Sequence, residues 1–281
     1  AVRNNEEIIA VFPGFKDEFD DRINEEPDMH KGTGDLSRLK VALSEEWGLD
    51  NLTCSLEVLQ SLQPVLREGE WKVTVAVRNN EEIIAVFPGF KDELFGIAVD
   101  VGSTTIAAHL CDLSTGEVSG SAGLMNPQIR FGEDLMSRVS YIMMNEGGEK
   151  DLTRVVREAI NEIITTIISE NNIDAEDILE MTLVGNPIMH HLVLGIDPTE
   201  LGAAPFALST DLSADIKAKE LNLNINSGAY VYVLPCVAGH VGADAAAVLL
   251  AEEPFNKDEI SLIVDVGTNA EIILGNNKRL L

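Results

Sequence analysis

One short pattern, an apolar run that ends in Asp-x-Gly and a hydroxyl residue, occurs twice in this chain of 281 residues. The first copy covers residues 97–104 and the second covers residues 262–269. A second run of β-prone residues follows each copy, and such runs on both sides of a glycine turn are typical of a β-hairpin. The sequence therefore predicts two similar strand–turn–strand units, and any fold for this chain must accommodate both.

The turn of each hairpin carries residue types that suit phosphate and Mg²⁺. Glycine lets backbone N–H groups approach an anion closely, and a carboxylate at a strand end can hold Mg²⁺ through water or orient an attacking water. One such turn would fit a plain hairpin, but two matching copies favour a phosphate site. The candidate catalytic and Mg²⁺-binding residues are Asp100 and Asp265, and the candidate phosphate-binding residues are Gly102, Ser103, Thr104, Thr105, Gly267, Thr268 and Asn269.

The paired motif resembles the two phosphate loops of the superfamily of acetate and sugar kinases, heat-shock chaperone ATPases and actin. In that superfamily, two ribonuclease H-like halves hold a nucleotide between two facing hairpins. The resemblance implies ATP and Mg²⁺ as cofactors. It also predicts that Asp100 and Asp265 face one another across a cleft.

Two other glycine-containing stretches could contribute to the same site. Gly239, Gly242 and Asp244 lie between a predicted strand and an alanine-rich helix, and a helix N-terminus favours anions. Close packing between that strand and helix would explain the glycines equally well. Gly185 and Asn186 hold a similar position, but Asn186 is better explained as the cap of the helix that follows.

The composition limits the possible partners. The formal net charge is −27 and the isoelectric point is about 4.3, so the chain repels nucleic acid and anionic membranes, and we expect neither as a partner. The same charge favours a nucleotide that arrives with Mg²⁺. No stretch approaches the roughly 18 apolar residues of a membrane span, and no basic-then-apolar leader opens the chain. Together with unpaired cysteines, these features predict a cytoplasmic location.

Other side chains with metal or acid chemistry give weaker signals. The three cysteines (Cys54, Cys111 and Cys236) have no Cys-x-x-Cys spacing, which excludes a zinc ribbon or an iron–sulfur cluster built from them alone. Cys236 is expected in the core. Neighbouring His190 and His191 would not share a helix face, so they form a poor metal site. Glu133 and Asp134 could face a nucleotide or a partner, but the solvated start of a helix explains them better.

A long exact repeat is also present. Residues 1–18 recur without a single change at residues 76–93. The later copy fits its context, because residues 71–77 alternate as a strand that can pair with it. The first copy has no such strand before it, so we expect that it does not pack as a second version of the later segment. We treat residues 1–22 as a duplicated segment of uncertain origin.

The remaining chain divides into three parts. Residues 23–93 predict a small α+β linker domain of two helices and a hairpin. Residues 94–258 follow the order of one ribonuclease H-like half, a strand meander and then alternating helices and strands, with a long helix capped by Asp151. Residues 259–281 supply the opening hairpin of a second half. The predicted fold class is α/β, with an actin- or sugar-kinase-type ribonuclease H-like domain, incomplete in its second half, after an α+β linker domain.

Five stretches narrow the resemblance to one family. They look like the reductive activators of corrinoid proteins and the related activases of methylamine and O-demethylase methyltransferase systems. The stretches are residues 100–118, 126–141, 183–198 with 204–206, 234–251 and 264–275. Among them, Asn126-Pro127-Gln128 and the alanine-rich segment that begins at Gly242 are the more specific. The resemblance covers residues 35–281.

The resemblance implies ATP-dependent reduction of a Co(II) corrinoid protein, a partner in a methyltransferase system, to its methyl-accepting Co(I) state. It implies electrons from an iron–sulfur domain, commonly [2Fe–2S], for which this chain carries no cysteine set. A homodimer is compatible with this reading, and this chain alone is not expected to complete the reaction. Two other functions stay open, which are a small-metabolite kinase of the same superfamily and a non-enzymatic nucleotide-binding scaffold.

Overall fold

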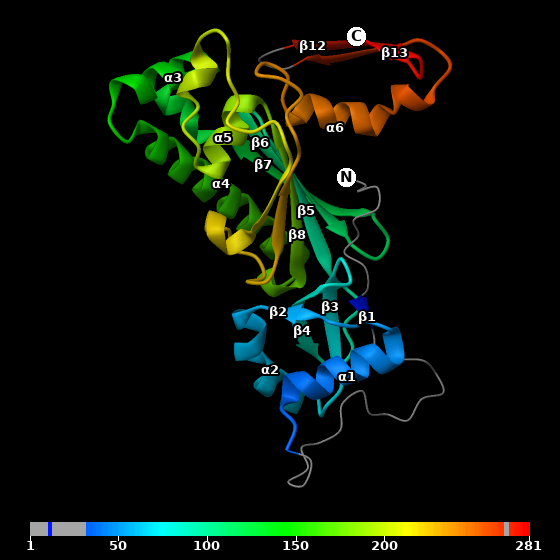
Figure 1. Ribbon diagram of the computed structural model, residues 1–281. Coiled ribbons are helices and arrows are strands. Elements are labelled where there is room, and N and C mark those ends of the chain that lie inside the picture. The colour runs from blue at the N-terminus through cyan, green and yellow to red at the C-terminus, as the bar shows by residue number, and fades with distance from the viewer. Residues whose placement is uncertain (1–10, 13–31, 267–269) are drawn as a thin grey trace.

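The computed structural model describes residues 11–12, 32–266 and 270–281, and its strands form three sheets along the length of the molecule (Figure 1). A four-stranded sheet lies at the N-terminal end, a six-stranded sheet lies in the middle, and a three-stranded sheet lies near the C-terminus. Helices accompany all three sheets. This arrangement confirms the predicted α/β class with a smaller α+β unit ahead of the main sheet.

The four-stranded sheet and two helices form the predicted linker domain. The linker hairpin turns at Asn79 and Asn80, whose φ angles are 52° and 56°, and asparagine tolerates this left-handed region better than most residues. The apolar sides of both helices pack on one face of the sheet, where Leu39, Leu43 and Leu66 are almost fully buried. The elements are α1 (Asp35–Trp47), β2 (Thr53–Cys54), α2 (Leu56–Glu68), β3 (Val73–Arg78) and β4 (Glu82–Pro88).

A short strand from the first copy of the repeat joins this sheet. β1 (Val11–Phe12) pairs antiparallel with β3, with Val11 opposite Ala76 and Phe12 opposite Val75. In the second copy, the matching Val86 lies opposite Val75 from the other edge of β3. The sequence did not predict that β3 would pair with β1, but these two residues lie on the other edge of β3 and so do not take the place of the second copy. The rest of that copy lies outside the described residues.

The six-stranded sheet has the order β7-β6-β5-β8-β10-β9. β5, β6 and β7 form an antiparallel meander, and β8 and β10 continue from β5 as parallel neighbours. This mixture of a meander with parallel crossovers is the ribonuclease H-like order that the sequence predicted. The strands are β5 (Phe95–Val101), β6 (Thr105–Asp112), β7 (Val118–Met125), β8 (Ile178–Gly185), β9 (Ala214–Lys217) and β10 (Tyr230–Val233).

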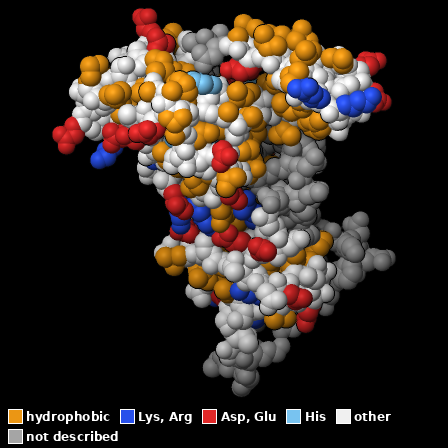
Figure 2. Space-filling model, turned by 45° about the horizontal axis from the view of Figure 1, so that its top comes forward, with side chains coloured by type: hydrophobic (Ala, Val, Ile, Leu, Met, Phe, Trp, Pro, Cys, Tyr) orange, Lys and Arg blue, Asp and Glu red, His pale blue; other side chains and the backbone are white. Residues whose placement is uncertain are grey.

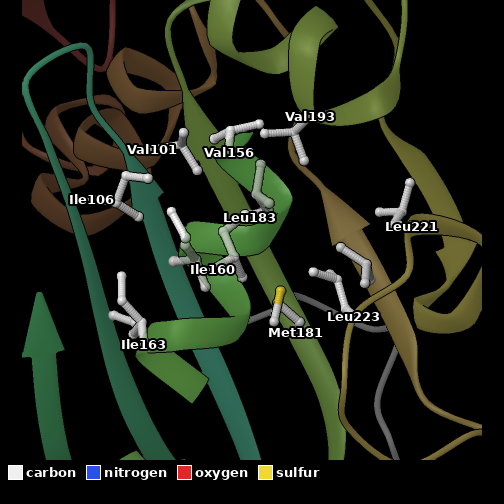
Figure 3. Packing of buried hydrophobic residues seen from close by; sticks show 14 of the residues in the cluster. Val101, Ile106, Val156, Ile160, Ile163, Met181, Leu183, Val193, Leu221 and Leu223 are labelled. Atoms are coloured by element: carbon white, nitrogen blue, oxygen red, sulfur yellow. The ribbon is translucent and has the colours of Figure 1, made fainter. Parts of the chain in front are cut away.

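Helices cover this sheet and form its core. In Figure 3, the Ile160 side chain of α4 lies next to Leu183 of β8, and both side chains are fully buried. Burial of apolar side chains on this scale is the main source of stability for the domain. The helices are α3 (Leu135–Met144), α4 (Gly148–Asn171), α5 (Pro187–Leu194) and α6 (Ala243–Glu252).

Two details of this domain differ from the sequence prediction. The long helix α4 begins at Gly148, with Gly147 at its N-cap, so Asp151 lies in its first turn and does not cap it. Acidic residues are favourable throughout a first turn, which is why Asp151 resembled a cap. Strand β9 (Ala214–Lys217) was not predicted, because it is a short edge strand that carries Asp215 and Lys217.

The linker domain packs firmly against the six-stranded sheet. Its face opposite α1 and α2 buries Ile84 and Phe87 in a cluster that includes Leu94 and Leu179 of the larger domain. Gly228 of the larger domain passes so close that a Cβ there would lie 1.8 Å from the Ile84 carbonyl oxygen. Strands β3 and β4 are therefore buried on both faces, which explains their nearly continuous apolar sequence.

Ion pairs surround this apolar contact. The Arg78 guanidinium lies 2.5 Å from an Asp215 carboxylate oxygen, and the Lys217 ammonium lies 2.6 Å from Glu82. The Tyr230 hydroxyl also donates to Glu82, at 2.6 Å. Figure 2 shows basic side chains (blue) and acidic side chains (red) close together in the middle of the molecule, where the two domains meet. The junction combines a buried core with a charged rim.

The second predicted hairpin forms its own three-stranded sheet. Its strands pair antiparallel and alternate between half-buried and exposed residues, with Val264 at 50% and Val266 at 75% exposure. The predicted turn residues Gly267, Thr268 and Asn269 lie outside the described residues. The elements are β11 (Ser261–Val266), β12 (Ala270–Asn276) and β13 (Arg279–Leu280). Over the ranges that the structure describes, no helix is both long and apolar enough to cross a bilayer.

Candidate functional site

The loop of the first Asp-x-Gly hairpin, residues 102–104, follows β5 at the point where the carboxyl ends of the parallel strands β5 and β8 lie side by side. Val101, the last residue of β5, is paired with Gly185, the last residue of β8. The contact is close, since a Cβ on Gly185 would lie 2.9 Å from the Val101 carbonyl oxygen. The loop after Val101 and the N-terminus of α5 are therefore direct neighbours. In open α/β sheets, ligands bind at this kind of edge.

The loop itself is narrow and permits only glycine at its start. A Cβ on Gly102 would lie 2.6 Å from the Thr105 carbonyl oxygen, so a larger residue would force the turn apart. The side chain of Ser103 is buried, whereas Thr104 and Thr105 are exposed. Asp100 is the second-last residue of β5, just before this loop. The loop thus presents hydroxyl groups and backbone to solvent at the sheet edge.

The helices α5 and α6 both begin beside this loop. The Asn186 side chain accepts hydrogen bonds from the N–H groups of Ile188 and Met189, which supports its interpretation as a helix cap. A Cβ on Gly242, the N-cap of α6, would lie 2.6 Å from the Asn186 Cα. The glycine at 242 is therefore needed for close packing of the two helix starts.

Gly239 also serves packing in this structure. A Cβ there would lie 2.2 Å from the Phe206 carbonyl oxygen. The ring of Phe206 in turn lies 4.0 Å, centroid to centroid, from the ring of the adjacent His240. Gly239 and Gly242 are thus closely packed, although against Phe206 and Asn186 rather than between β10 and α6.

Three aspartates from three segments, Asp100, Asp244 and Asp265, influence one another electrostatically at this edge. Burial, followed by the charges of Asp244 and Asp265, raises the pKa of Asp100 to about 6. Burial is also the main cause that raises the pKa of Asp244, with Asp265 adding to it. Asp265 therefore lies within electrostatic reach of both residues. Because a cation would relieve this repulsion, the group suits a bound metal–phosphate complex.

Glu271 is a member of this group that the sequence analysis missed. It lies directly opposite Asp265 in the β11–β12 pairing. Its pKa is raised by burial and then by the charges of Asp244 and Asp265. The signal was present in the sequence, because a hairpin at residues 262–272 places these two acidic residues on the same face.

The carboxylates fit Mg²⁺ better than a metal enclosed by protein alone. Within the ranges that the structure describes, no three His, Cys, Asp or Glu side chains are placed to hold a metal ion together. Mg²⁺ commonly keeps several waters and takes one or two carboxylates with substrate phosphates. Asp100, Asp244 and Asp265 could supply such carboxylates beside the loop.

The other side chains considered from sequence have structural roles here. Asp134 caps α3, where its carboxylate accepts from the Ser137 N–H at 2.7 Å, and both Asp134 and Glu133 are exposed. His190 and His191 are buried, and burial lowers the pKa of His190 to about 4. Cys236 is buried as expected, and burial raises its pKa to about 11. Cys54 and Cys111 lie in different domains, on β2 and β6.

Comparisons with known proteins agree on one family. Residues 95–256 match the RACo middle region, and residues 23–93 match the RACo linker region. The chain is 36% identical over 213 residues to the corrinoid activation enzyme RamQ of Eubacterium limosum, covering 74% of this chain and 35% of that protein. It is 26% identical over 206 residues to the [Co(II) methylated amine-specific corrinoid protein] reductase of Methanosarcina barkeri, covering 67% of this chain and 35% of that protein.

A solved structure gives the same picture. The structure of a reductive activator for corrinoid, iron–sulfur protein superimposes with a TM-score of 0.79 at 30% sequence identity. The match covers 99% of this chain and 48% of that chain. The chain therefore spans about a third of the length of the two curated relatives and about half of the solved one.

Proposed function

The chain belongs to the RACo family of reductive corrinoid activators, and from that membership we propose that it carries the nucleotide-binding part of an ATP-driven activator. In this proposal, the whole protein reduces a Co(II) corrinoid protein to the Co(I) state. ATP supplies the free energy for this uphill step. The electrons come from an iron–sulfur domain outside this chain, since Cys54, Cys111 and Cys236 do not lie together.

The observation that carries the proposal is the meeting of the loop after Asp100 with the acidic group from two other segments. Asp244 lies at the start of α6, and Asp265 lies at the end of β11. A glycine turn and hydroxyl groups beside several carboxylates suit a nucleotide with Mg²⁺ better than they suit a free anion. A basic, phosphate-neutralising surface would have indicated a different way of binding.

Each part of the site has a role in this proposal. Gly102, Ser103, Thr104 and Thr105, with Gly267, Thr268 and Asn269 of the second hairpin, bind the phosphate chain. Mg²⁺ would neutralise the phosphate charge and withdraw electrons from the transferred phosphoryl group. The Asp100 carboxylate, with its raised pKa, and the Asp265 carboxylate hold the ion through water or orient the water that attacks the terminal phosphate. Closure of the two hairpins on the nucleotide moves the domains that carry the docked corrinoid protein.

The first test is binding of nucleotide by the 281-residue chain itself. Titration calorimetry with ATP and Mg²⁺ should give binding that weakens when Mg²⁺ is chelated, because the carboxylates repel the bare phosphates. The control variant is Asp112→Asn, which should bind as the wild type does. It removes a carboxylate at the far end of β6, whose oxygen accepts from Ser114 in the turn that follows. Binding that is stronger without Mg²⁺ would contradict the proposed site.

The second test addresses the reaction and uses a protein of the full family length. ATP hydrolysis and the appearance of Co(I), followed by its absorbance, are measured with and without a corrinoid protein. We expect both to require the partner and the nucleotide. ATP turnover driven by a sugar or a small acid would instead identify a kinase, and nucleotide binding without turnover would identify a scaffold.

A further inference from the structure

A buried arginine lies directly beneath the first phosphate-type loop. Arg138, on α3, has no exposed surface, and its guanidinium donates to the Ser103 carbonyl oxygen. Its other bonds go to the Gly132 carbonyl at 3.1 Å and to the Gln128 side-chain oxygen at 3.2 Å. A buried cation is costly unless its donors are satisfied, so this one is kept for its contacts.

Asn126 holds the two neighbouring carbonyls of the same loop. Its side-chain amide donates to the Gly102 carbonyl at 2.8 Å, and its backbone N–H donates to the Thr104 carbonyl at 2.8 Å. Asn126 is also fully buried. Three consecutive carbonyls, those of Gly102, Ser103 and Thr104, are therefore held on the inner side of the loop.

Peptide geometry converts this into a direction for the N–H groups. In a planar trans peptide, the N–H of each residue points opposite to the C=O of the residue before it. With the Gly102 and Ser103 carbonyls directed inward, the N–H groups of Ser103 and Thr104 point to the outer side. That side is the sheet edge where Asp100 lies, and outward N–H groups in a tight turn form an anion-binding concavity.

The frame that supports these contacts extends through the domain. The Gln128 side-chain amide donates to the Leu152 carbonyl of α4 at 2.9 Å, and Arg138 lies 3.5 Å from the Met189 sulfur of α5. Burial lowers the pKa of Arg138 to about 10, which still leaves it charged at neutral pH. The loop is thus held from behind by Arg138 and Asn126, whose surroundings include α4 and α5, and it has a positive charge beneath it.

We propose that Arg138 and Asn126 are positioning residues that hold the loop at residues 102–104 with its N–H groups directed at the phosphates of the ligand. They act from behind the loop and do not contact the ligand. This inference rests on the proposed nucleotide function for the identity of the ligand, but the geometry itself concerns only a phosphate group.

The test uses two substitutions and a matched control. Arg138→Lys keeps the charge, but a single ammonium cannot reach the Ser103, Gly132 and Gln128 oxygens together. Asn126→Asp keeps the size but removes the donor to the Gly102 carbonyl. Arg157→Lys is the control, because Arg157 likewise donates to a backbone carbonyl, that of Val193 at 2.8 Å, near the C-terminal end of α5.

The measurements are affinities for Mg²⁺–pyrophosphate and Mg²⁺–ATP, together with the ¹⁵N amide shifts of Ser103 and Thr104 on ligand addition. We expect Arg138→Lys to weaken both ligands about tenfold, since one charge-assisted hydrogen bond corresponds to about that factor. The amide shifts should shrink in Arg138→Lys, and Arg157→Lys should match the wild type.

The outcomes separate this inference from the proposed function. Affinities and amide shifts in Arg138→Lys equal to those of the wild type would overturn the positioning role, even if Asn126→Asp does not fold. Wild-type protein that binds neither ligand would overturn it as well. Pyrophosphate that binds and depends on Arg138, without binding of ATP, would support the positioning role and remove the nucleotide function.

Discussion

The two Asp-x-Gly hairpins have similar sequences but different surroundings. In the β5–β6 hairpin, Val101 after the aspartate is fully buried, because β8 lies on one side and helices cover the face. In the β11–β12 hairpin, the equivalent Val266 is 75% exposed, because β11 pairs only with β12 among the described strands. The pattern thus determines the turn, and the neighbouring strands determine how firmly it is held.

The aspartates of the two hairpins differ in the same way. Asp100 lies opposite Ala107, so its repulsive neighbours come from other segments. Asp265 lies opposite Glu271, so the second hairpin brings two carboxylates to the site. The first hairpin thus brings one carboxylate beside a closely packed loop, and the second brings two carboxylates.

The largest expected effect concerns chemistry and would show whether both hairpins act. In a protein of the full family length, Asp265→Asn should lower ATP hydrolysis by around 10²-fold or more, as for a lost electrostatic catalytic group. Reductive activation of the corrinoid protein should fall with it, whereas electron transfer to an artificial dye should persist. Asp100→Asn should give a similar loss, and Asp258→Asn, at the other end of the second hairpin, is the control. Unchanged activation in Asp265→Asn would remove the second hairpin from the site.

The next effect concerns packing and uses the equivalent valines. In the 281-residue chain, Val101→Ala should lower the free energy of unfolding by about 2 kcal/mol, because it leaves a cavity in the core. Val266→Ala should change it by less than about 0.5 kcal/mol, since the side chain is exposed. Urea unfolding followed by circular dichroism measures both. Equal losses would mean that the second hairpin is covered in solution, for example by another copy of the chain.

The smallest effect concerns protonation. The pKa of Asp100 is about 6, above its usual value of 3.8, so the folded chain binds a proton there more readily than the unfolded chain. Stability therefore falls as the pH rises from about 4 to about 6, and Asp100→Asn should be more stable than wild type at pH 7 by about 1 kcal/mol after allowance for solvent exposure. The difference should vanish near pH 4. Unfolding titrations at several pH values would reveal it.

A direct titration of Asp100 can link the two hairpins. Asp265→Asn removes one of the charges that raise the Asp100 pKa, so that pKa should move toward its usual value. Carboxyl-carbon NMR of Asp100 measures the shift directly. An Asp100 titration that does not change in this variant would show that the two aspartates are too far apart to share one ion.

Local patterns in the sequence predicted much of the fold, including both hairpins, the order of the main sheet and the caps of α5. They did not predict the role of Arg138, because its position three residues after Leu135 and four before Ile142 puts it on the apolar face of α3 but does not identify a partner for its guanidinium. Its partner, the Ser103 carbonyl, lies 35 residues away in sequence and comes into reach only when α3 folds against the sheet. Glu271 lies across the hairpin from Asp265 and outside the Asp-x-Gly motif, so the motif alone does not indicate it. Contacts made by distant backbone groups leave no local pattern to read.

The junction between the linker domain and the main sheet has a mechanical consequence. Because β3 and β4 are buried on both faces, and ion pairs surround the contact, the linker cannot swing freely without exposing Ile84 and Phe87. Interfaces with apolar cores of this kind resist independent domain motion. We therefore expect the linker domain and the six-stranded sheet to rotate together as one body. Because α1 and α2 lie at the outer end of the linker domain, a small rotation of the sheet would displace them by more than it displaces the residues at the junction (Figure 1).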